Sequence, residues 1–211
     1  MAENYQKNLD SEISRITAAG RKPRLLLHVC CAPCSSYVLE YLSQHFDITA
    51  CFYNPNISPK SEYDYRAQEL VRLTQEMPLT HPVACRIESY DPTAFAQIAA
   101  GLENEPEGGA RCTACYRLRL EETAKIAAAD GYDYFTTTLS ISPLKDAQRL
   151  NTIGGELAQV YGVPYLFSDF KKREGYKRSI QLSAEYDLYR QDYCGCAFSK
   201  AESQRRKIDK I

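Results

Sequence analysis

Apolar positions along the chain predict strands and helices in alternation. Short apolar runs, typical of buried strands, lie at 25–29, 48–53, 83–87, 134–138 and 164–167. Segments with helical apolar spacing lie at 5–19, 35–45, 58–76, 93–100, 112–129, 146–161 and 176–189. Because helices of this length separate the strands, we expect a mostly parallel sheet with helices on both faces, that is, a Rossmann-like α/β domain.

The chain is long enough for one such domain. It has 211 residues, of which 44% are hydrophobic, and no repeat, low-complexity tract or clear linker divides it. We therefore expect a single domain over 1–211. It would comprise an N-terminal helix within 1–22, an α/β core over 23–170 and a C-terminal helical segment over 171–211 that carries a Cys-Gly-Cys motif.

Charge and the N-terminal sequence restrict location and partners. The formal net charge is −1, so no global field draws the chain to nucleic acid or membrane, and any RNA site must be a local patch. The first residues lack the apolar core of a signal peptide, and no later apolar run approaches the roughly 18 residues of a membrane span. We expect a cytoplasmic protein with no membrane partner.

Nine cysteines are many for a reducing compartment, where metal binding and redox chemistry are their usual roles. Two of them, Cys51 and Cys85, stand alone in predicted strands, which favours core packing. The other seven form three motifs: Cys30-Cys31 with Cys34, Cys112-x-x-Cys115, and Cys194-Gly195-Cys196.

The first motif follows the first strand directly, at the sheet edge where α/β domains bind ligands. Adjacent cysteines in a strand point to opposite faces, so Cys30 and Cys31 can serve one centre only where the strand breaks into the Ala32-Pro33 turn. Two neighbouring thiolates crowd one zinc tetrahedron, whereas a cubane cluster offers each a separate iron. Iron-sulfur ligation is therefore favoured, with structural zinc as the alternative.

The second motif begins a predicted helix. The positive end of the helix dipole and Arg111 both favour the thiolate forms of Cys112 and Cys115. A single C-x-x-C fits half of a zinc site, half of a cluster site or a thioredoxin-like dithiol. The dipeptide Thr113-Ala114 and the absence of a strand just before it disfavour the thioredoxin interpretation.

The third motif is a C-x-C pair. A disulfide between Cys194 and Cys196 would close a small, strained ring, and Gly195 removes the side chain that would hinder closure. Strained disulfides are easily reduced, which suits a dithiol that cycles. Two further metal ligands, or surface thiols without a role, are the alternatives.

The basic residues and the candidate proton donors indicate function less specifically than the cysteine motifs do. Positive charges before and after the third motif could contact RNA phosphates, although such runs are usually solvated: Lys171, Lys172, Arg173, Lys177, Arg178, Arg205, Arg206 and Lys207. Candidate proton donors are Tyr193, Asp192 and His28, and none stands out.

In chain order, five segments resemble the QueH-type epoxyqueuosine reductases. They are HVCCAPCS (28–35), FYNPNI (52–57) with Glu62, Tyr63 and Arg66, RCTACYRLR (111–119), FTTTLSISP (135–143) and YCGC (193–196). The resemblance covers roughly residues 5 to 200, and its motifs are long enough to be specific.

The resemblance implies a HUP-type α/β fold, a [4Fe-4S] cluster and the last step of queuosine synthesis. That step is the two-electron reduction of epoxyqueuosine to queuosine at the wobble position of tRNA with a GUN anticodon, which serves Tyr, His, Asp and Asn. We expect a monomer that takes its electrons from a donor the sequence does not name.

The resemblance also implies roles for individual cysteines. Cys30, Cys31, Cys112 and Cys115 match the cluster cysteines, and Cys194 with Cys196 match the redox-active pair. Members of the family are also known with a second iron beside the cluster, and Cys34 is a candidate ligand for it.

Two other functions are alternatives to that of an epoxyqueuosine reductase. An ATP-dependent tRNA-modifying enzyme of HUP type should carry a Ser-Gly-Gly-x-Asp-Ser loop after the first strand, where this chain has Cys30-Cys31-Ala32-Pro33-Cys34-Ser35. A zinc-stabilised RNA-binding module would be colourless, whereas a cluster protein would be brown and oxygen-sensitive.

Overall fold

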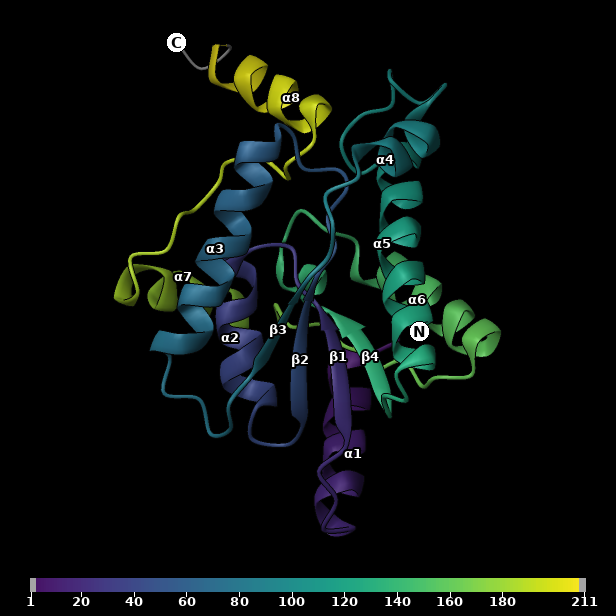
Figure 1. Cartoon of the computed structure of the whole chain (residues 1–211), viewed down its shortest axis with the longest axis vertical. Helices are drawn as coiled ribbons and strands as arrows, with labels where there is room; N and C mark the ends of the chain where they lie inside the picture. Colours follow the sequence, from purple (N-terminus) through teal and green to yellow (C-terminus); the bar gives the residue numbers. More distant parts are fainter. Residues whose placement is uncertain (1–2, 209–211) are drawn as a thin grey trace.

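The computed structural model describes residues 3–208. Its sheet has four parallel strands in the order β3-β2-β1-β4: β1 Arg24–His28, β2 Asp47–Phe52, β3 Ala84–Ile87 and β4 Tyr134–Thr137 (Figure 1). This is the strand order of a Rossmann-type sheet. His28 pairs with Cys51 of β2 and with Thr137 of β4, so the carboxyl ends of the three strands are nearly level.

Helices cover both faces of the sheet. They are α1 Tyr5–Ala18, α2 Ala32–Leu42, α3 Lys60–Glu76, α4 Pro92–Ala99, α5 Ala110–Ala129, α6 Ala147–Tyr161, α7 Gly175–Glu185 and α8 Ala197–Ile208, with a 3-10 turn η1 at Thr138–Ile141. In β1, Leu25 and Leu27 pack with α1, α2 and α3, whereas Leu26 packs with α5 and α6. This two-residue alternation produces two cores and confirms the predicted α/β class.

Two cysteine motifs lie at the starts of helices. Helix α2 begins at Ala32, three residues earlier than the pattern predicts, because Pro33 suits the first turn and Cys31 can act as the N-cap. Helix α5 likewise begins at Ala110, so Cys112 lies in its first turn. The third motif connects α7 to α8, and Figure 1 shows α8 above the carboxyl end of the sheet.

The expected strand at 164–167 is reduced to one bridge between Tyr165 and Phe135. Pairing stops there because side chains bind the next backbone groups: Thr136 Oγ1 donates to Leu166 O at 2.8 Å, and Asn151 of α6 binds Ser168. Its Oδ1 accepts from Ser168 N at 2.9 Å, and its Nδ2 donates to Ser168 O at 2.8 Å.

The expected helix at 176–189 ends at Glu185. Asp187 has a positive φ of 46°, and the N–H of Leu188 donates to Ser183 O at 2.8 Å, which closes the last turn. Among residues 3–208, no helix is long and apolar enough to cross a membrane.

Candidate metal and redox site

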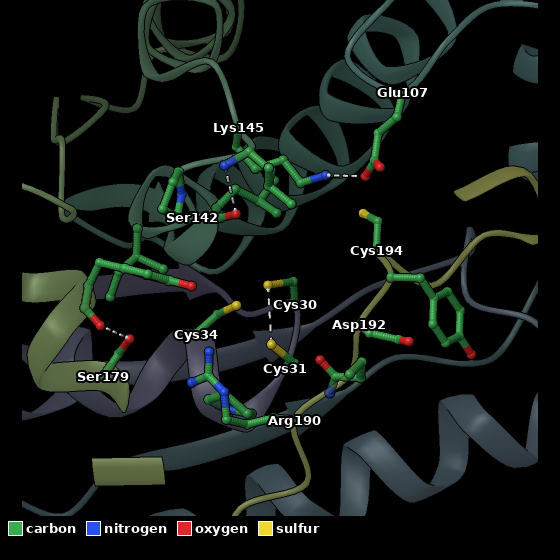
Figure 2. A pocket seen from close by; sticks show the side chains of 18 of the residues that line it. Cys30, Cys31, Cys34, Glu107, Ser142, Lys145, Ser179, Arg190, Asp192 and Cys194 are labelled. Atoms are coloured by element: carbon green, nitrogen blue, oxygen red, sulfur yellow. Dashed lines mark hydrogen bonds and ion pairs between the residues drawn. The ribbon is translucent and has the colours of Figure 1, made fainter. Parts of the chain in front are cut away.

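All three cysteine motifs meet at the carboxyl edge of the sheet, around two adjoining cavities. The larger cavity, of about 360 Å³, is lined by Cys30, Cys31, Cys34 and Cys194 (Figure 2). The smaller one lies between α5 and α8 and is lined by Cys112, Cys115, Cys194 and Cys196. Because Cys194 and Glu107 line both cavities, the two spaces are neighbours.

The structure groups the first three cysteines more tightly than the sequence predicts. Cys30 Sγ and Cys31 Sγ are 3.8 Å apart, and with Cys34 Sγ all three sulfurs lie within 4.8 Å of one another. The strand has ended at His28, so the two adjacent side chains can face one centre, as expected. Cys34 is thus an equal member of this group.

Within this group the three thiols shift one another's pKa in opposite directions. Hydrogen bonds from the thiols of Cys31 and Cys34 lower the pKa of Cys30, and the nearby Arg119 guanidinium acts in the same direction. The same hydrogen bonds to Cys30, together with burial, raise the pKa of Cys34, and that of Cys31 rises in the same way. The lowered pKa of Cys30 favours its thiolate, and three sulfurs this close together can serve as donors to a metal centre.

His28 holds the strand ends together and does not line the larger cavity. Its Nε2 lies 3.1 Å from Tyr53 O and its Nδ1 lies 2.9 Å from Thr137 Oγ1, whose oxygen also accepts from Leu139 N. Burial, helped by Arg119, lowers the pKa of His28 to about 3, so the ring is neutral. A neutral ring donates from Nε2 and accepts at Nδ1, which makes His28 structural and removes it as a proton donor.

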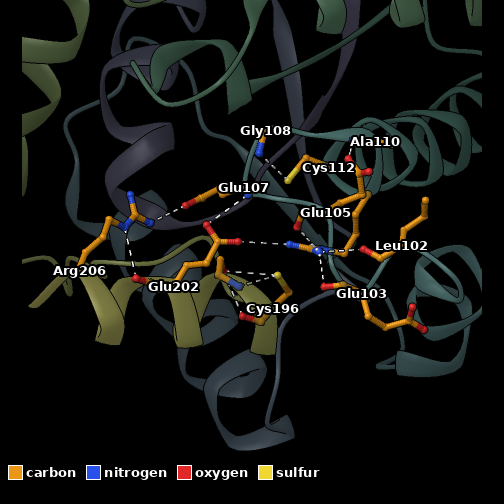
Figure 3. A network of polar contacts seen from close by, with 12 residues as sticks. Leu102, Glu103, Glu105, Glu107, Gly108, Ala110, Cys112, Cys196, Glu202 and Arg206 are labelled. Carbon is orange, nitrogen blue, oxygen red and sulfur yellow. Dashed lines mark hydrogen bonds and ion pairs between the residues drawn. The ribbon is translucent and has the colours of Figure 1, made fainter. Parts of the chain in front are cut away.

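Helix α8 is fixed to the loop that precedes α5 by buried charges (Figure 3). Arg111 is 2% exposed and donates from Nη1 to three carbonyl oxygens of this loop, at Leu102, Glu103 and Glu105. Its Nη2 lies 3.5 Å from Glu202 Oε1 of α8. This docking brings the N-terminus of α8, and with it Cys196, to the first turn of α5.

Sulfurs near these helix ends accept backbone hydrogen bonds. Cys196 Sγ accepts from Ser199 N at 3.4 Å, and Cys112 Sγ accepts from Gly108 N at 3.2 Å. Burial nevertheless raises the pKa of Cys112, and it raises that of Cys115 to about 12. Burial therefore opposes the thiolate forms of both cysteines in the metal-free chain.

The Cys-Gly-Cys loop is held against the start of α3. Gly195 has φ +129°, a conformation that favours glycine, and its carbonyl accepts from Ser58 N at 3.0 Å. Arg66 donates from Nη1 to Cys194 O at 3.2 Å, and its guanidinium carbon lies 5.2 Å from the centroid of the Tyr193 ring. Within the described residues, all cysteines are free thiols.

Arg119 is the unusual residue of this region. It is 1% exposed, and it has no carboxylate partner among residues 3–208. Nη1 donates to Asn54 Oδ1 at 3.3 Å and Nε to Cys115 O at 3.4 Å, while Nη2 has no hydrogen-bond partner in the described chain. Burial would lower its pKa, but the surrounding cysteine sulfurs, led by Cys115, raise it.

A buried cation without a counter-ion is costly, so this site requires an anion. The nearby groups that can become anionic are, first, the sulfurs of Cys115, Cys194 and Cys30, which come from all three motifs, and then the Tyr116 hydroxyl. A cluster held by several thiolates is an anionic group, so the residues around Arg119 fit it.

Arg119, Lys145 and Glu107 carried no assigned role at the sequence level. Arg119 follows Arg111 and Cys115 at intervals of four residues along one buried helix face, a spacing that could have identified it. Lys145 and Glu107 lie outside helices and strands, where no periodicity marks them. Cys51 and Cys85 pack against the two cores, as predicted.

Comparison with known proteins agrees with the motifs. A family model described as "Epoxyqueuosine reductase QueH" matches residues 25–202. A relative of that name from Staphylococcus epidermidis is 47% identical over 200 residues, which cover 93% of this chain and 84% of the relative. Its namesake from Thermotoga maritima is 34% identical over 188 residues, covering 88% and 94%. The chain therefore belongs to the QueH family of epoxyqueuosine reductases, and it is an oxidoreductase.

Proposed function

We propose that this chain reduces epoxyqueuosine to queuosine in tRNA, using an iron-sulfur cluster and the Cys194/Cys196 dithiol. Family membership supports the reaction. The observation that carries the cluster is Arg119, a buried guanidinium that lacks a carboxylate and lies among cysteine sulfurs.

The cluster ligands in this proposal are Cys30, Cys31, Cys112 and Cys115, and the cluster is of the [4Fe-4S] type. These cysteines line the two adjoining cavities, two to each. Cys34 lies with Cys30 and Cys31 and is the candidate ligand for a second iron. When bound, such a centre supplies single-electron transfer and a Lewis-acidic iron.

The dithiol accounts for the stoichiometry of the reaction. Converting an epoxide to an alkene and water consumes two electrons and two protons, which is what two thiols release on forming a disulfide. Cys194 lines the larger cavity, where a substrate can enter, and also the smaller cavity beside Cys196. An external electron donor must then reduce the disulfide before the next turnover.

The substrate in this proposal is the wobble base of a tRNA with a GUN anticodon. A cavity of about 360 Å³ lies within the range that encloses small ligands, and unpaired anticodon bases can be splayed out of their stack into such a pocket. Arg190 and Asp192 line the cavity and are exposed to solvent.

The basic run at 171–178 is a weaker phosphate site than its sequence suggests. Four of its five cations pair with carboxylates: Lys171 with Asp169, Arg173 with Asp10, Lys177 with Glu174, and Arg178 with Glu40. Arg206 and Lys207 of α8 are likewise paired, with Glu107 and Asp192. Neutralised cations release fewer counterions from RNA, so they contribute less to binding.

Arg190 is the better candidate for a phosphate contact. It is exposed, lines the larger cavity and has no carboxylate partner in the described chain. Its Nη1 donates to Ser183 Oγ at 3.0 Å, and Figure 2 shows the guanidinium directed toward Cys34. A guanidinium in this position can bind the backbone of the nucleotide whose base enters the cavity.

We predict opposite effects of Arg119→Met on the metal-free and the loaded protein. Removal of an uncompensated buried charge should leave the free energy of unfolding of the metal-free protein equal or raise it by about 1–2 kcal/mol. The same change should reduce the iron and sulfide retained after anaerobic reconstitution. Urea unfolding and metal analysis measure the two effects. Arg117→Met, an exposed position on the same helix, is the control that should change neither. Full iron retention by Arg119→Met would contradict the proposal.

The dithiol is tested by Cys194→Ala. Without the pair, the reconstituted enzyme should not be able to cycle, so sustained turnover with excess tRNA and reductant should fall by at least about 100-fold. Cys85→Ala, which removes a packed core thiol, should turn over at the wild-type rate. Mass spectrometry of digested tRNA measures queuosine. Repeated turnover by Cys194→Ala at the native rate would exclude the dithiol as the source of electrons.

The tRNA contact is tested by the salt dependence of binding. Arg190→Gln should make the slope of log K against log salt shallower by about 0.7–0.9, the value of one lost phosphate contact. Lys177→Gln, which removes an ion-paired cation, should leave the slope nearly unchanged. Equal slopes for Arg190→Gln and the wild type would remove Arg190 from the RNA site.

A further inference from the structure

The larger cavity contains one buried ammonium group, that of Lys145. Lys145 follows η1, is 8% exposed, and lines the cavity together with Cys194. Its Nζ lies 3.6 Å from Glu107 Oε1 and 5.9 Å from the centroid of the Tyr116 ring. Figure 2 shows the Cys194 sulfur beside the pair formed by Lys145 and Glu107.

Glu107 fixes the position of this ammonium. One of its oxygens faces Lys145, and the other accepts from Arg206 Nη2 at 2.8 Å. The N–H of Glu107 donates to Glu202 Oε2 at 3.2 Å, so α8 holds the carboxylate in place (Figure 3). Burial alone would lower the pKa of Lys145, but the Cys194 sulfur and Tyr116 raise it, so the amine is protonated.

Other groups that face the cavity are less available as proton donors. The Tyr193 ring lies 5.2 Å from the Arg66 guanidinium carbon, and burial raises the pKa of its hydroxyl. The guanidinium groups of Arg66, Arg190 and Arg206 do not release protons. Asp192 forms an ion pair with Lys207, which lowers its pKa and keeps it ionised. The hydrogen-bonded His28 ring lies outside the cavity lining.

We propose that Lys145 is the proton donor to the epoxide oxygen. This inference rests on the proposed function. The reaction breaks both C–O bonds of the epoxide, forms the C=C bond and releases the oxygen as water. The Cys194/Cys196 dithiol supplies two electrons and two protons and becomes a disulfide, which balances the reaction.

Within this scheme Lys145 moves both protons. Its ammonium transfers one proton to the oxygen as the Cys194 sulfur attacks the epoxide carbon, so that a C–S bond forms while the first C–O bond breaks. The resulting amine takes the proton of Cys194. Cys196 then attacks the Cys194 sulfur, so the S–S bond forms and the C–S bond breaks. The C–S electron pair becomes the C=C bond, and the second C–O bond breaks as Lys145 passes its proton to the oxygen, which leaves as water. The second proton of the dithiol then restores the ammonium, so Lys145 is unchanged after one turnover.

The test is the anaerobic single-turnover rate of Lys145→Arg with tRNA that contains epoxyqueuosine. Arginine keeps the positive charge beside Glu107 but cannot donate a proton, so queuosine formation per bound iron should fall by about 10²–10⁴-fold. The Kd for tRNA and the iron content should equal those of the wild type. Lys60→Arg, at an ion-paired lysine of α3, is the control that should react normally.

A second measurement separates proton transfer from a structural role. Methylamine and other small primary amines should restore the rate of Lys145→Ala, to a degree that varies with the pKa of the amine. A Lys145→Arg variant that reacts at the wild-type rate, or a Lys145→Ala variant that no amine rescues, would overturn the assignment. If the wild type itself forms no queuosine, the proposed function fails instead.

Discussion

The charge of Arg119 is the constraint on which the rest of the site depends. A guanidinium buried this deeply needs a negative partner, and among the described residues no carboxylate supplies one. Its electrostatic neighbours are sulfurs from three separate parts of the chain, Cys30, Cys115 and Cys194. The arrangement therefore fits the anionic sulfur-ligated centre that we propose.

The fold brings those sulfurs together by placing each motif where a regular element starts or ends. The parallel strands end level with one another, and the hydrogen bonds of His28 to Tyr53 and Thr137 join those ends. Helix α5 contributes its first turn to the same edge, and α8 is docked there through Arg111 and Glu202. The cysteine positions thus depend on backbone and charge contacts far apart in sequence.

Much of this could be predicted from the sequence because it depends on local pattern. The apolar run at 25–29 predicts β1, and the seven clustered cysteines predict a metal or redox site. What could not be predicted depends on distant partners. The bond from Asn151 to Ser168 ends the strand pairing at Tyr165, and the pairing of Arg173 with Asp10 joins residues 163 apart in sequence. The position of Glu107 beside Lys145 depends on contacts with α8, which come from a distant part of the chain.

The central claim is most directly tested by analysis of the wild-type protein purified without oxygen. We expect a brown protein with broad visible absorption, about four iron and four sulfide per chain for a [4Fe-4S] centre, and the loss of both when Cys31 is replaced by Ser. A colourless protein that contains about one zinc per chain and no sulfide after anaerobic reconstitution would contradict the account.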